Sequence, residues 1–334
     1  ACAGEYESAQ IVLVPRAGHD ATYVLSGGDL TGPGGARVPC ESLNLFLYAR
    51  TEMPSGYNAR HPIGEYPEAL LPSTEATLKT GETTPLFATW RVPPDAPPGR
   101  YRGAVVLSAA GRRHEVPVEM TVWKIALPLR SRWMDTPSSL KGDAFVGAVP
   151  LGRDGKPLDR RQQLRAIVDM HLKYRLTACD AGVTGHLLAL RLAEFEAEME
   201  RYVAAGATKI YLGSAQQLLK AHADKLPTVE QYLRQKGWID YFYVRPGFDE
   251  ASSDLIPQIR AVCEAWKKVS RIPLMETYYH EEPAGLYGML DIFCRSVSDA
   301  PWIRERMAAG DRFWRVNAFT NHLETPPWTI RRSY

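Results

Sequence analysis

The chain has 334 residues, of which 45% are hydrophobic and 23% charged, and its formal net charge is +2. This composition is that of an ordinary globular protein, and the length is enough for two domains. Lysine and arginine are dispersed and no apolar run approaches the ~20 residues of a membrane span, which argues against nucleic-acid and membrane partners.

The first 127 residues are rich in glycine, proline, serine and threonine, and short apolar runs alternate with turn signals. No helical periodicity is present, so residues 1–127 are predicted to form an all-β sandwich domain. Turns are expected at 95–103 and 109–114. The expected strands are 8–15, 43–51, 85–93, 103–111 and 114–123.

From residue 128 to 334, strand-like and helix-like segments alternate. Repeated strand–helix units indicate a parallel sheet, and this many strands favours a (β/α)8-type barrel, an α/β fold. An eighth strand is not evident, so the barrel is expected to be truncated before it. The expected strands are 132–136, 175–179, 208–213, 240–244, 272–279, 290–294 and 312–319.

Helical spacing of apolar residues predicts helices at 159–174, 192–206, 228–237 and 252–269. Gly206 and Gly237 are expected to end two of them. The buried stripe of the last helix is expected to comprise Leu255, Ile259, Val262, Trp266 and Val269.

The five cysteines have no zinc-ligand or C-x-x-C spacing. They are interpreted as thiols, and a Cys2–Cys40 bridge stays open as an alternative. The chain begins without methionine and ends without a closing element, which predicts a partial reading frame.

Two adjacent carboxylates, Asp249 and Glu250, follow the expected strand at 240–244. In a (β/α) barrel the chemistry lies where strands end and loops lead into helices. Neighbouring carboxylates repel, so one can stay protonated while the other is ionised. Glycoside hydrolysis needs such an acid and such an anion. The alternative is that the pair is merely the acidic start of the next helix.

Several segments resemble glycoside hydrolase family 123, in the family's order and over nearly the whole chain. Any one of these matches is weak, but the ordered set is fairly specific. They are "GEYESAQIVLVP", "YPEALLP", "TTPLFATWRVPPDAPPGRYRGAVVL", "VPVEMTVWKIALP", "HLKYRLTA", "FEAEMERYVAAGATKIYLG" and "QKGWIDYFYV" with the Asp-Glu pair after it.

The resemblance implies an exo-acting, substrate-assisted retaining hydrolase of N-acetylhexosaminides, N-acetylgalactosaminidase-like, that is secreted or periplasmic and needs no cofactor. Glu250 would be the general acid and base, and Asp249 would orient the substrate's acetamido group. The chain departs from the family's D-E-P pattern, because "RPGF" precedes the pair and Ala251 replaces the proline. A non-catalytic carbohydrate-binding or scaffold protein that keeps the fold is the alternative.

Other residues near the expected rim compete for roles. Glu281 and Glu282 of "YYHEEP" could be catalytic instead, and Glu276 or Glu281 could supply a distant second carboxylate. His280 lacks a second histidine at helical spacing, so no metal site is expected. For substrate binding, Tyr278 and Trp314 could stack on a sugar, with core packing as the alternative, and Asn317 could donate to a hydroxyl.

Overall fold

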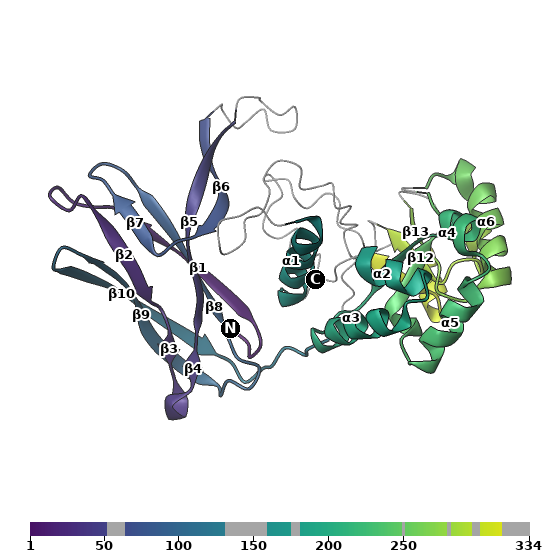
Figure 1. Ribbon diagram of the computed structural model, residues 1–334, viewed down its shortest axis with the longest axis horizontal. Helices are drawn as coiled ribbons and strands as arrows, with labels where there is room; N and C mark the ends of the chain where they lie inside the picture. Colours follow the sequence, from purple (N-terminus) through teal and green to yellow (C-terminus); the bar gives the residue numbers. More distant parts are fainter. Residues whose placement is uncertain are drawn as a thin grey trace. The chain divides into compact units, whose positions relative to one another are not determined.

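The computed structural model of the chain describes residues 1–51, 64–130, 159–174, 181–248, 251–278, 282–295 and 301–315. The chain divides into two compact units, Ala1–Leu129 and Arg130–Tyr334 (Figure 1). The division falls close to residue 127, where the composition of the sequence changes.

The first unit consists of two antiparallel sheets and no α-helix among its described residues (Figure 1). One sheet has the order β1 (Tyr6–Leu13), β8 (Thr84–Arg91), β5 (Cys40–Thr51), β6 (Gly64–Pro72). The other has the order β4 (Arg37–Val38), β3 (Leu30–Thr31), β9 (Gly99–Ala109), β2 (Ala21–Gly27), β7 (Glu75–Leu78), and β10 (Arg112–Val122) pairs with β9.

Both sheets contribute alternate residues to one apolar core, the arrangement of a β-sandwich. The buried indole of Trp90 donates a hydrogen bond of 2.6 Å to the carbonyl of Gly28, and Tyr101 donates one of 2.8 Å to the carbonyl of Pro97. Cys2 and Cys40 are free thiols, so the alternative of a Cys2–Cys40 bridge is wrong.

The expected strands of this unit are confirmed as β1, β5, β8, β9 and β10. The turn at 109–114 is confirmed as a tight hairpin, in which Ala110 and Gly111 both have positive φ, as a two-residue primed turn requires. The turn at 95–103 is shorter than expected, because β9 already begins at Gly99.

The second unit is an α/β structure with parallel strand pairs. Its strands are β11 (Ile210–Ser214), β12 (Phe242–Arg245), β13 (Met275–Tyr278), β14 (Ile292–Arg295) and β15 (Arg312–Arg315). Its helices are α1 (Arg160–Lys173), α2 (Ala181–Leu188), α3 (Leu192–Ala204), α4 (Ala215–His222), α5 (Leu226–Gln235), α6 (Ile256–Val269) and α7 (Pro301–Ala308).

The five strands are neighbours in chain order. β11 pairs with β12, and β13, β14 and β15 pair in sequence. A parallel bridge between Val244 and Leu274 connects the two groups, and the Val244 N–H donates to the Pro273 carbonyl at 2.9 Å. Strands that follow one another along the chain and in space are the pattern of repeated strand–helix units.

The two faces of these strands differ. Phe242, Val244 and Phe293 belong to a large core that also contains Phe195 of α3 and Trp266 of α6. The opposite face forms a separate cluster to which all five strands and no helix contribute: Tyr211, Tyr243, Met275, Ile292, Cys294 and Trp314.

That second cluster shows that the strands curl around it. The rings of Tyr243 on β12 and Trp314 on β15 lie 5.1 Å apart, edge to face. Three strand spacings separate β12 from β15, which would be roughly 14 Å in a flat sheet. The inner side chains of β12 and β15 therefore meet across a curved surface.

The expected strands at 208–213, 240–244, 272–279, 290–294 and 312–319 are confirmed as β11 to β15, while those at 132–136 and 175–179 lie outside the described residues. Parallel strand–helix alternation is thus confirmed, and closure into a barrel stays a prediction. In the described part of the chain, no helix is both long and apolar enough to cross a bilayer.

The four expected helices are confirmed as α1, α3, α5 and α6. Asp159 caps α1 through a reciprocal capping box with Gln162, a local arrangement that satisfies two free N–H groups. Gly206 and Gly237 follow α3 and α5 with positive φ, as expected. Three helices were not expected from the sequence: α2, α4 and α7.

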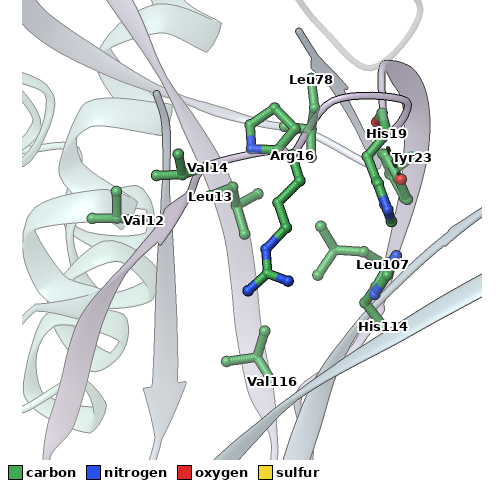
Figure 2. Close-up of a pocket in the computed structure, with 11 residues that line it drawn as sticks. Val12, Leu13, Val14, Arg16, His19, Tyr23, Leu78, Leu107, His114 and Val116 are labelled. Atoms are coloured by element: carbon green, nitrogen blue, oxygen red, sulfur yellow. Dashed lines mark hydrogen bonds between the residues drawn. The ribbon is translucent and has the colours of Figure 1, made fainter. Parts of the chain in front are cut away.

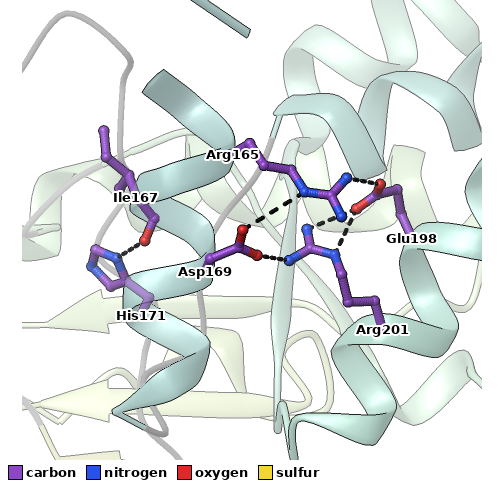
Figure 3. Close-up of polar contacts among 6 residues, drawn as sticks. All are labelled: Arg165, Ile167, Asp169, His171, Glu198 and Arg201. Atoms are coloured by element: carbon purple, nitrogen blue, oxygen red, sulfur yellow. Dashed lines mark hydrogen bonds and ion pairs between the residues drawn. The ribbon is translucent and has the colours of Figure 1, made fainter. Parts of the chain in front are cut away.

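Helices α1 and α3 are joined by ion pairs (Figure 3). Glu198 of α3 accepts from Arg165 of α1 at 2.7 Å and from Arg201 of its own helix at 2.7 Å. Asp169 of α1 pairs with Arg201 and lies 3.8 Å from Arg165. Four alternating charges therefore link the two helices at their partly exposed surface.

Candidate functional site at the carboxyl ends of the strands

The loops that leave β11 and β12 touch each other, and the loop after β12 also contacts the end of β13. The Gln216 N–H, just after β11, faces the Pro246 carbonyl, just after β12, at 3.4 Å. The Ala251 N–H donates to the carbonyl of Thr277 in β13 at 3.0 Å. The carboxyl ends of three consecutive parallel strands thus form one continuous edge, the place where α/β proteins bind ligands.

Gly247 lies where two of these loops are closest. Its φ is +121°, a conformation that favours glycine. A Cβ there would lie 2.6 Å from the Ser214 hydroxyl and 3.0 Å from the Gln216 side-chain oxygen. Glycine therefore allows the loop after β12 to approach two polar side chains at the end of β11, Ser214 and Gln216.

A buried ion pair supports this edge from below. Glu276 of β13 is fully buried, and its Oε1 accepts from Arg245 Nη2 at 3.1 Å and from the Thr277 N–H at 2.8 Å. Arg245 Nη2 also donates to the Phe248 carbonyl at 3.0 Å. Burying a carboxylate is costly unless it is paired and hydrogen-bonded, and Arg245 meets that requirement while also holding the loop after β12.

Cys294 lies on the inner face beside this pair. Burial raises the pKa of the Cys294 thiol to about 11, although a hydrogen bond with Thr277 and the nearby Arg245 act in the opposite direction. The thiol therefore stays protonated at neutral pH, and Cys294 is unsuited to act as a nucleophile, for which the thiolate is required.

Three of the predicted site residues, Asp249, Glu250 and Asn317, lie outside the described residues. The residues on either side of the pair, Phe248 and Ala251, belong to the edge just described. The roles of Asp249 and Glu250 in catalysis therefore stay predictions. Hydrogen bonds hold the two flanking residues, Phe248 and Ala251, at the carboxyl ends of β12 and β13.

The competing carboxylates have different surroundings. His280 and Glu281 lie outside the described residues, whereas Glu282 accepts a 2.6 Å hydrogen bond from the Tyr287 hydroxyl. Glu276, named above as a distant second carboxylate, is buried and occupied by Arg245. Its engagement favours a supporting role over direct contact with a substrate.

Tyr278 and Trp314 are only 5% and 6% exposed. Tyr278 packs in the core shared with the helices, and burial together with Glu276 raises the pKa of its hydroxyl far above the ordinary value. Trp314 packs on Tyr243 inside the curl. These positions favour the core-packing alternative, and the contribution of either ring to sugar binding stays a prediction.

Arg245 and Glu276 were not expected to form a pair. The sequence does carry a signal, because each is a charged residue at or near the end of an otherwise apolar strand, "YFYVR" and "PLMETY". Within the described ranges, no group of three or more histidine, cysteine, aspartate or glutamate side chains is arranged to hold a metal ion.

No protein-family model matches the chain, and no curated protein sequence matches it. Among solved structures, the chain is similar to a family 123 glycoside hydrolase from Clostridium perfringens that hydrolyses glycolipid glycans. The identity is 12%, the TM-score is 0.57, and the match covers 94% of this chain and 66% of the hydrolase. The chain thus spans less than two thirds of that protein's length.

Two further structures match with TM-scores too low to support an argument. One is a glycosyl hydrolase family 2 member from Bacteroides cellulosilyticus, with 10% identity, coverage of 94% of this chain and 40% of that one, and a TM-score of 0.28. The other is a β-glucuronidase from Parabacteroides merdae, with 8% identity, coverage of 92% and 38%, and a TM-score of 0.24. At 12% identity, the likeness to the family 123 hydrolase shows a glycoside hydrolase-like fold alone.

Proposed function

We propose that the chain is an exo-acting glycoside hydrolase that removes terminal N-acetylhexosamine units from glycans, outside the cytoplasm. The observation that carries the proposal is the likeness of fold to a family 123 hydrolase over 94% of the chain. In this proposal, residues 1–127 are the sandwich domain and residues 128–334 are the catalytic domain. Its curled sheet belongs to a (β/α)8-type barrel.

Glu250 is proposed as the general acid and base, and Asp249 as the group that orients the substrate's acetamido function. Glu250 donates its proton to the glycosidic oxygen while the acetamido oxygen attacks the anomeric carbon, so that the glycosidic bond breaks and the aglycone leaves as an alcohol. Water then opens the cyclic intermediate and gives its proton to Glu250. Support comes from Phe248 and Ala251, which flank the pair and are held at the carboxyl ends of β12 and β13.

The second candidate is a carbohydrate-binding protein without turnover. The specific observation that favours it is the spacing after β12. This strand ends at Arg245, and Pro246, Gly247 and Phe248 still separate it from the Asp-Glu pair. The family resemblance implies a pair closer to its strand, so the added residues alter the loop on which catalysis would depend.

Turnover of an aryl N-acetyl-β-hexosaminide distinguishes the two candidate functions. The hydrolase proposal predicts turnover by the full chain and a loss of about 10²–10⁴ in kcat for Glu250→Gln, the usual size of acid/base assistance. Glu282→Gln is the matched control, because its carboxylate is already hydrogen-bonded to Tyr287. A thiazoline analogue of the cyclised intermediate should inhibit the enzyme strongly.

Binding of the matching free sugar without any turnover supports the second candidate. Activity that survives Glu250→Gln and collapses in Glu282→Gln contradicts the proposed acid/base. Rapid cleavage of the 2-hydroxy glycoside without thiazoline inhibition contradicts the role given to Asp249, because that substrate lacks the acetamido group.

A further inference from the structure

A cleft of about 400 Å³ opens at one edge of the β-sandwich, within the first unit (Figure 2). It is formed by the end of β1 and the loop after it on one side, and by β2, β7, β9 and β10 of the other sheet. This volume is within the range of small-molecule sites, about 300–1,000 Å³.

The floor of the cleft is apolar. Leu13, Tyr23, Leu78 and Leu107 line it, and all four are buried members of the sandwich core. Val116 of β10 also lines the cleft. Val12 and Val14, which also line the cleft, are largely exposed, and an apolar group that covers them is stabilised by their removal from water.

Three basic side chains stand over this floor. Figure 2 shows the Arg16 side chain entering the cleft between Leu13 and Leu107. Across from it, the rings of His19 and His114 lie 5.7 Å apart, on the loop after β1 and on β10. Groups that are far apart in the sequence therefore converge on one volume.

Among the residues that the structure describes, no acidic side chain lines the cleft. The nearby carboxylates are engaged elsewhere: Asp20 accepts from Thr80, including its N–H at 2.9 Å, and Glu115 pairs with Arg113 at 2.6 Å. Within the described residues, the Arg16 guanidinium forms no hydrogen bond or ion pair. The cleft thus holds a cationic donor without a protein acceptor, next to the exposed apolar side chains of Val12 and Val14.

We propose that this cleft binds a small molecule with a carboxylate on an apolar body. The carboxylate would accept from Arg16, whose planar donors match it in a two-point contact, and from the imidazole N–H groups. The apolar body would cover the exposed Val12 and Val14 and lie against the apolar floor. A neutral sugar fits less well, because Tyr23 is buried and offers no ring face for stacking, and the floor offers no partners for hydroxyl groups.

Calorimetric titration of the full chain with octanoate tests the proposal. Octanoate should bind saturably, and octylammonium, which has the same chain and opposite charge, should bind at least about 10-fold more weakly. Arg16→Gln should weaken octanoate binding by about 10-fold or more, because the charge-assisted hydrogen bonds of the guanidinium to the carboxylate are lost. Arg16→Lys should retain part of the affinity. Arg100→Gln, an exposed arginine on β9 outside the lining, should change nothing.

Val116→Phe tests the apolar half of the site without a change of charge. The larger side chain should fill the cleft and abolish octanoate binding, while phenylalanine suits a β-strand and should leave the melting temperature nearly unchanged. Equal binding of octanoate and octylammonium, full affinity in Arg16→Gln, or no saturable octanoate binding by the folded wild-type chain would each overturn the proposal. Because this site is separate from the carboxyl edge of the second unit, glycosidase activity has no bearing on the result.

Discussion

The two units bury polar groups in opposite ways. The buried polar residues described in the sandwich, Asn44 and Thr89, are neutral, whereas those described in the α/β unit include two side chains that carry a charge, Lys209 and Glu276. Lys209 immediately precedes β11, at the amino ends of the strands, and Glu276 lies in β13 and is bound to Arg245 at their carboxyl ends.

The two units therefore differ in what determines their stability: packing in the sandwich, and the compensation of buried charges in the α/β unit. An apolar core such as that of the sandwich gains stability from burial and packing, and no pH change within the ordinary range alters it. Buried charges reduce stability unless they are compensated, so their presence makes the α/β unit sensitive to single substitutions and to pH.

Removal of the Glu276 carboxylate should have the largest effect on stability. Glu276→Ala leaves the partly buried Arg245 without its acid, and breaking a buried pair from one side costs about 3–5 kcal/mol. The matched control is Glu264→Ala, whose partner Arg260 is half exposed on α6 and whose loss should cost less than about 0.5 kcal/mol. Urea unfolding of both variants measures the difference. Similar losses would contradict the prediction that the buried pair contributes more to stability than the exposed pair.

The Lys209 ammonium should make the stability of the α/β unit depend on pH. Burial, with Arg312 and Arg130 nearby, lowers the pKa of Lys209 to about 8. The unfolded chain keeps the ordinary value of about 10.4, so it binds more protons than the folded chain between these values. The free energy of unfolding therefore rises with pH through that window. Below pH 8, burial of the charged Lys209 ammonium lowers it by about 3 kcal/mol.

Lys209→Met removes this dependence. At pH 7 the free energy of unfolding of the variant should rise relative to that of the wild type. This relative gain should shrink by roughly 2 to 3 kcal/mol when the pH reaches 10. The lost hydrogen bond to the Asp240 carbonyl lowers both values equally, so the change between the two pH values is the quantity to measure. Lys268→Met, at an exposed position of α6, should show no such change, and a pH-independent difference for Lys209→Met would contradict the shift.

The elements that the sequence predicts are those with a repeated apolar signal. The stripe Ile259, Val262 and Trp266 predicts α6, and Phe195, Met199 and Tyr202 predict α3, because each set packs one face against the sheet. The two-residue strands β3 and β4 are too short for any periodicity. β6 contains Pro67 and Pro72, which suit only an edge strand, and β6 is one.

The candidate site is less predictable because it depends on tertiary contacts. That loops lie at the carboxyl ends follows from the strand–helix order alone. The pairing of Arg245 with Glu276 does not, because these residues belong to neighbouring strands whose register is known only once β12 and β13 are aligned. In the same way, Arg16, His19 and His114 are brought together by the two sheets, and no local pattern joins the third to the first two.

The sandwich should show a smaller loss that pH does not alter. Trp90→Phe removes the indole donor from the Gly28 carbonyl and leaves that buried acceptor unpaired beside a small cavity, at a cost of about 2 kcal/mol. Neither group titrates, so urea unfolding at pH 7 and at pH 10 should give the same difference from wild type. Trp123→Phe, at an exposed position just after β10, should cost less than about 0.5 kcal/mol. A loss for Trp90→Phe that changes between the two pH values would mean that this core interaction is coupled to a titrating group, such as Tyr101 of the same core, and the contrast between the two units would fail.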